Sequence, residues 1–67
     1  MNFIECHEKE TNQRILVPID KIITITQLQE DLTAFIEMSF DADGNGVGFS
    51  TKELYVEIVA KIRLKNI

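Results

Sequence analysis

The sequence predicts an α+β fold, a small antiparallel β-meander of four or five strands with one C-terminal α-helix packed on one face. Three observations favour this fold. Residues 2–26 contain short runs rich in β-branched residues, separated by polar turns. Residues 33–51 alternate apolar and polar side chains around a turn rich in Asp, Asn and Gly. From Lys52 to about Leu64, apolar residues recur at the spacing of a helical face. With 67 residues, the chain is expected to be a single domain, residues 1–67.

The N-terminal residues predict a β-hairpin. Asn2–His7 is expected to be the first strand, with Ile4 and Cys6 on the face opposite Phe3 and Glu5. The polar run 8–13 predicts the loop of the hairpin. Arg14–Ile19 is expected to be the second strand, with its odd-numbered apolar residues on one face.

A corner and a third strand are expected to follow. Pro18 cannot donate to a β-ladder, so it marks the end of the second strand or an edge position. Asp20-Lys21 predicts a short corner. Ile22–Thr26 is entirely β-branched, which is typical of a strand. The polar residues 27–31 predict a loop, with Leu28 directed inward.

The stretch from Thr33 to Ser50 predicts a second hairpin. Apolar residues alternate along Thr33–Phe40, with Phe35 as the exception. Residues 41–46 (DADGNG) tolerate positive φ, which a tight reversal needs. Val47–Ser50 is the expected returning strand, in which Gly48 indicates a bulge or a close backbone approach.

The C-terminal residues predict an amphipathic helix. Residues 50–53 (STKE) match the S/T-x-x-E capping box, so the helix is expected to begin at about Lys52. Its apolar face would comprise Leu54, Tyr55, Ile58, Val59 and Ile62. Val56 lies off that face and is available for a second contact, such as one between subunits.

The central turn also permits an alternative interpretation as an EF-hand-like calcium loop. Positions 1, 3, 5 and 6 of such a loop are matched by Asp41, Asp43, Asn45 and Gly46. Position 8 is Gly48, and position 12 is Lys52, a cation where a bidentate carboxylate is required. Glu53 comes one residue late. We therefore predict a turn with no metal site and no cofactor. A calcium-binding module that uses Asp41, Asp43, Asn45 and Glu53 remains the alternative.

Composition favours self-association in the cytoplasm. The hydrophobic fraction of 45% exceeds what one small core can bury, so we expect a homodimer or a higher homo-oligomer. The net charge of −4 argues against nucleic-acid binding. Lys61, Arg63 and Lys65 suit the negative end of a helix dipole. The single Cys6 fits a reducing compartment. Neither a signal peptide nor a membrane span is expected, since Met1–Glu10 is charged and no long apolar run occurs.

The chain lacks a pattern typical of a catalytic site. Cys6 and His7 are adjacent in an expected strand, so their side chains should point to opposite faces and cannot form a nucleophile–base pair. Ser50 is explained by helix capping. The Gly-rich turn lacks the Lys-Ser/Thr of a phosphate loop. We therefore predict a protein that is not an enzyme.

The order of elements resembles that of the small bacterial FlbD-like proteins. Three segments carry the resemblance, namely FIECHEKETNQRILVPIDKIITI, TAFIEM and GVGFSTKELYVEIVAKI. The long DADGNG turn and the polar QLQED segment depart from the family pattern. The resemblance implies a small cytoplasmic accessory or regulatory module. The resulting hypothesis is a small non-enzymatic homo-oligomeric interaction or accessory module.

Overall fold

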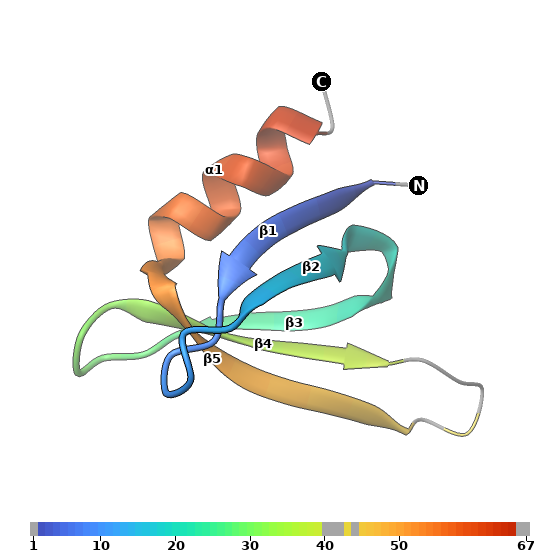
Figure 1. Cartoon of the computed structure of the whole chain (residues 1–67). Coiled ribbons are helices and arrows are strands. Elements are labelled where there is room, and N and C mark those ends of the chain that lie inside the picture. The colour runs from blue at the N-terminus through green and yellow to red at the C-terminus, as the bar shows by residue number, and fades with distance from the viewer. Residues whose placement is uncertain (1, 40–42, 44, 66–67) are drawn as a thin grey trace.

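The computed structural model describes residues 2–39, 43 and 45–65. Within these residues the chain forms an α+β fold with five antiparallel strands in two sheets and one C-terminal helix (Figure 1). The elements, in chain order, are β1 (Phe3–His7), β2 (Arg14–Pro18), a 3-10 turn η1 (Ile19–Lys21), β3 (Ile22–Gln27), β4 (Thr33–Ser39), β5 (Gly46–Leu54) and α1 (Tyr55–Lys65). The predicted fold class is confirmed.

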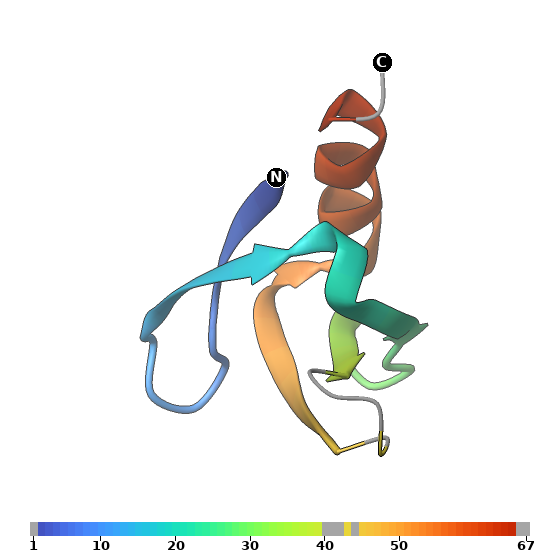
Figure 2. The ribbon, with the colours of Figure 1, turned by 90° about the vertical axis from the view of Figure 1, so that its right-hand side faces the viewer.

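The two sheets are joined through β5. One sheet is the β1–β2 hairpin and the other has the order β3-β4-β5. Just beyond β1, Glu8 forms a β-bridge with Thr51, and Lys9 N–H donates to the carbonyl oxygen of Ser50 (2.9 Å). The spatial order of strands is therefore β2, β1, β5, β4, β3. The helix α1 continues directly from β5 and lies beside β1, above the three-stranded sheet (Figure 1), and Figure 2 shows the hairpin and α1 rising from that sheet.

The predicted alternation in the first hairpin is confirmed. Ile4 pairs with Val17 and Cys6 with Ile15. Ile4, Cys6 and Val17 are buried, whereas their strand neighbours face outward. Ile19, expected at the end of the second strand, instead begins η1, although its N–H still donates to the carbonyl oxygen of Asn2 across the hairpin (3.0 Å).

The second hairpin is also confirmed. Met38 pairs with Val47 and Ser39 with Gly46, so β4 and β5 lie antiparallel on either side of the turn. Strands therefore flank the Asp-rich turn where an EF-hand would have helices. Phe40, expected to end the first of these strands, and residues 41, 42 and 44 of the turn lie outside the described residues.

The core lies between the β1–β2 hairpin, β4 and the inner side of α1. Ala34, Ile36 and Met38 of β4 are buried, as their alternation predicted, and Ile58 of α1 is fully buried against them. Burying a side chain of this size stabilises the fold by about 1.5–3 kcal/mol.

Gly48 makes the close approach that its place in the strand predicted. A Cβ added there would lie 2.6 Å from Cζ of Phe35. The aromatic ring of β4 therefore lies over the glycine of β5, and a larger residue would displace it. Gln27, expected in the loop, extends β3 by pairing with Ala34, while Leu28 is half-buried.

The predicted helix start at Lys52 is wrong, because β5 runs past this position and α1 begins at Tyr55. Thr51 is fully buried. Its Oγ1 accepts a hydrogen bond from Ala34 N–H (3.3 Å) and lies 2.9 Å from the carbonyl oxygen of Glu53, to which the hydroxyl can donate. The hydroxyl is therefore used within an irregular stretch of the β4–β5 ladder and not as a helix cap.

A different residue stabilises the start of α1. Glu57 Oε1 accepts a hydrogen bond from Leu54 N–H (3.3 Å). Leu54 directly precedes the helix, so this bond is the one that the glutamate of a capping box makes to the residue before the helix. The N–H of Tyr55 donates to the carbonyl oxygen of Leu32 (2.8 Å). Leu32 has a φ of 63°, which a leucine rarely adopts, and this conformation directs its carbonyl group to the helix start.

Candidate interaction surface

Large apolar side chains remain exposed on several elements. Their exposed fractions range from 39% to 70%, and they comprise Phe3, Leu16, Ile23, Leu32, Val47, Leu54, Val56 and Leu64. Single exposed apolar residues are ordinary, but neighbouring ones mark candidate interaction sites. Three groups can be distinguished, on α1, on the first hairpin and on the outer face of the three-stranded sheet.

The first group lies on α1. Val56, Ala60 and Leu64 occupy positions i, i+4 and i+8 and so form one stripe along the helix. We call these three residues the α1 outer stripe. They adjoin Tyr55, Val59 and Arg63, with which they line a shallow, mainly apolar hollow of about 520 Å³. Val56 is 63% and Leu64 is 70% exposed.

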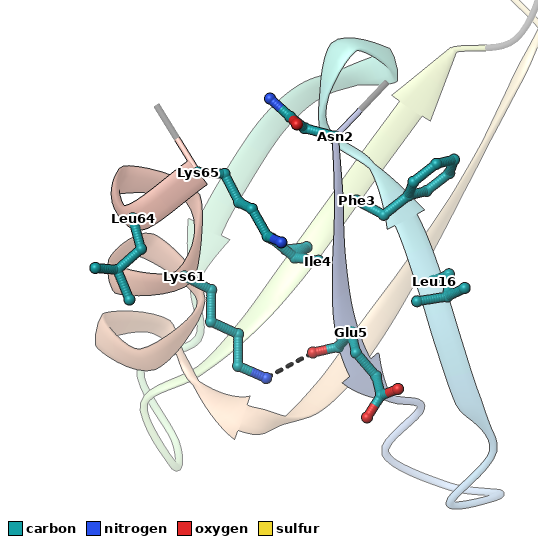
Figure 3. A pocket seen from close by; sticks show the side chains of 8 residues that line it. All are labelled: Asn2, Phe3, Ile4, Glu5, Leu16, Lys61, Leu64 and Lys65. Carbon is teal, nitrogen blue, oxygen red and sulfur yellow. Dashed lines mark hydrogen bonds between the residues drawn. The ribbon is translucent and has the colours of Figure 1, made fainter. Parts of the chain in front are cut away.

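The second group lies where the first hairpin approaches α1. A hollow of about 560 Å³ is lined by Asn2, Phe3, Ile4, Glu5, Leu16, Lys61, Leu64 and Lys65. Figure 3 shows Lys61 and Lys65 directed from the helix toward β1, whereas Phe3 and Leu16 lie on the far side of that strand. Lys61 Nζ donates to the carbonyl oxygen of Glu5 (2.6 Å), so this hollow is partly closed by an existing contact.

The third group lies on the outer face of the β3–β4–β5 sheet. Ile23 and Val47 are exposed beside the half-buried Phe35 ring. Polar groups interrupt this patch, since Thr24 Oγ1 donates to Glu37 Oε1 (2.7 Å).

A polar contact joins the first hairpin to the end of β5. Glu53 accepts hydrogen bonds from the backbone N–H of His7 (2.9 Å, at Oε1) and from Nδ1 of the His7 ring (2.7 Å, at Oε2). An ionised carboxylate can only accept, so the Nδ1 atom carries the proton in this pair. The residues are separated by 46 positions in sequence, and local patterns could not predict their contact.

This contact shifts the ionisation of Glu53. Burial is the largest single influence and disfavours the charged carboxylate, but the hydrogen bonds from the side chain and backbone of His7 outweigh it. The pKa of Glu53 is therefore lowered below its usual 4.5. The carboxylate is charged at neutral pH and holds β1 against the end of β5.

Cys6 is not a reactive thiol in this environment. The side chain is fully buried. Burial, with the nearby Glu53 carboxylate, raises the pKa of Cys6 from 9.0 to about 11. The nucleophilic thiolate is thus scarce at neutral pH, and solvent cannot reach it.

The residues of the alternative calcium site are not brought together by the described part of the chain. Asp43 and Asn45 are exposed at the turn, and Asp41 lies outside the described residues. Glu53 is at the opposite end of β5, where eight extended residues place it roughly 26 Å from Asn45. Its carboxylate is engaged by His7. No cluster of three or more His, Cys, Asp or Glu suited to a metal ion occurs among the residues that the structure describes.

An ion pair joins the loop after β1 to the loop before β4. Lys9 Nζ lies 2.7 Å from Asp31 Oδ2. The side-chain contact with Lys9, followed by hydrogen bonds from Thr33, lowers the pKa of Asp31 from 3.8 to about 2. Both partners are substantially exposed, so the pair contributes little to stability.

Comparison with known proteins identifies no relative. No family model matches the chain, and no curated protein or solved structure is significantly similar to it. Within residues 2–39, 43 and 45–65, no helix has the length and apolar character needed to cross a bilayer.

Proposed function

We propose that this chain is a small non-enzymatic interaction module that associates with copies of itself. The observation that carries the proposal is the exposed apolar surface, above all Val56 and Leu64 on α1. Water contact with these side chains is unfavourable, and association would remove it. Closed symmetric assemblies of identical chains are the commonest way to cover such a surface.

The environment of the titratable residues supports a role without catalysis. The Cys6 thiol is buried and its pKa is raised to about 11, which makes it a poor nucleophile. The Glu53 carboxylate binds the His7 side chain and backbone, so both groups serve a contact between segments. The net charge of −4 supports a protein partner in preference to a nucleic acid.

The pattern of elements supports an accessory or regulatory role in the cytoplasm. The resemblance to FlbD-like proteins implies such a module, and a lone cysteine fits a reducing compartment.

The oligomeric state tests this proposal directly. We expect sedimentation velocity over a wide range of protein concentrations to show a reversible increase in mass above that of the 7.7 kDa monomer. A sedimentation coefficient that stays monomeric throughout the range would contradict the proposal. A calcium titration in the same buffer tests the alternative function, for which micromolar binding is the decisive result.

A further inference from the structure

We propose that two copies of the chain associate through the α1 outer stripe, with their helices antiparallel and a twofold axis near Ala60. This inference rests on the proposed self-association and specifies its surface and orientation. It follows from the spacing of the stripe, the small residue at its centre and the distribution of charge along α1.

The stripe lies opposite the buried side of the helix. Ile58 is fully buried against the sheets, whereas Val56 and Leu64 are 63% and 70% exposed. Positions 56, 60 and 64 follow each other around one side of an α-helix, with position 58 roughly opposite. The helix therefore has apolar residues on two sides, and the protein's own core covers only one of them.

The order of side chains within the stripe is self-complementary. Ala60 is the small central residue, and a small residue allows two helix backbones to approach closely. Val56 and Leu64 are each four residues from Ala60. In an antiparallel pair centred there, Val56 of one copy faces Leu64 of the other, twice over, as twofold symmetry requires.

Charge along the helix selects the antiparallel orientation. Glu57 lies in the first turn of α1, and Arg63, which lines the same hollow as the stripe, lies in its last turn. A parallel pair would place like charges side by side. An antiparallel pair places the acidic half of each helix beside the basic half of its partner, and it also opposes the two helix dipoles favourably.

The size of the stripe limits the strength of association. A helix of 11 residues is about 16 Å long, so the contact is smaller than a standard interface. We therefore expect a dimer that forms reversibly with a micromolar Kd and dissociates on dilution.

Substitution of the stripe has a matched control in the same chain. The double variant V56S/L64S removes two exposed apolar side chains from α1. The control V47S/L16S makes the same chemical changes at residues of similar exposure on β5 and β2. By sedimentation velocity we expect the first variant to raise the dimer Kd at least about tenfold, and the control to change it less than about twofold.

Cross-linking tests the orientation. Cys6 is buried, so a cysteine introduced on the stripe supplies the accessible thiol. With a short bismaleimide, we expect A60C to cross-link to itself and a mixture of V56C and L64C to give the mixed dimer. V56C alone should cross-link poorly, because two copies of residue 56 would lie roughly 12 Å apart along the antiparallel axis.

The outcomes separate the surface from the proposed function. Efficient cross-linking of V56C alone would overturn the antiparallel arrangement. A dimer that survives V56S/L64S but dissociates in V47S/L16S would overturn the α1 surface and still support self-association. A wild-type chain that is monomeric at every concentration would overturn both.

Discussion

The inner and outer sides of α1 differ in environment far more than in composition. Ile58 and Val56 are both β-branched and lie two residues apart, yet Ile58 is fully buried and Val56 is 63% exposed. On the inner side, an apolar side chain stabilises the fold of one copy. On the outer side, the same type of side chain leaves apolar surface in water. The comparison shows that residue type alone does not separate core from candidate interface.

The largest expected effect on stability comes from removing the buried Ile58 side chain on the inner side of α1. We expect I58A to lower the free energy of unfolding by about 2–5 kcal/mol, because it removes a buried side chain and leaves a cavity. Urea denaturation followed by circular dichroism measures this change. A loss below about 1 kcal/mol would contradict the tight packing of α1 on the sheets.

A smaller effect is expected where β5 ends and α1 begins. T51V keeps the shape of Thr51 but removes the hydroxyl that bonds Ala34 N–H and reaches the carbonyl oxygen of Glu53. The unpaired backbone groups should cost about 1–3 kcal/mol of stability. The matched substitution T26V changes an exposed threonine of β3 and should be nearly neutral in the same denaturation experiment. Equal stability of T51V and T26V would show that the buried hydroxyl is dispensable.

Acid pH should weaken the contact that fixes β1 to this junction. The pKa of Glu53 is lowered in the folded state, so its contribution to stability is fully present above about pH 4.5 and is lost as the pH falls through the folded-state value. We expect E53Q to reduce stability by about 1 kcal/mol at pH 7 and to flatten the acid part of the stability profile. Unfolding measured from pH 7 to pH 3 gives both quantities. E37Q, which alters an exposed carboxylate on β4, is the control. An unchanged pH profile in E53Q would argue against the His7 contact.

The smallest effect on stability is expected on the outer side of α1. V56S should change the free energy of unfolding of the dilute monomer by no more than about 0.5 kcal/mol, because Val and Ser have similar helix propensities and the site is exposed. Thermal unfolding at low protein concentration measures it. A loss as large as that of I58A would show that Val56 belongs to the core of one copy, and would remove the contrast between the two sides of the helix.

Sequence periodicity predicted those parts of the fold in which the side chains of a single strand divide between a buried and an exposed face. The alternation in Asn2–His7 predicted that Ile4 and Cys6 share one face, and the structure shows that this face is the buried one. The alternation in Thr33–Phe40 predicted an apolar face, of which Ala34, Ile36 and Met38 are buried. The predicted helix start at residues 50–53 was wrong. Their S/T-x-x-E pattern is a valid helix start, but the irregular pairing with β4 uses the Thr51 hydroxyl and keeps these residues in the strand.

Sequence patterns predict the α1 outer stripe only in part. The sequence places Val56 off the expected apolar face of the helix. For Leu64 the sequence predicts only that it lies near the helix end, and its place in an exposed stripe with Ala60 follows from the side of α1 that meets the sheets.

The α+β class, the two hairpins and the apolar face of β4 could be predicted from side-chain periodicity and turn residues, because these act over a few neighbouring positions. Long-range packing sets the residue at which β5 ends and α1 begins, the contact between His7 and Glu53, and the side of the helix that remains exposed. Those features depend on contacts between segments far apart in the chain, and such contacts can override a local preference for helix or strand.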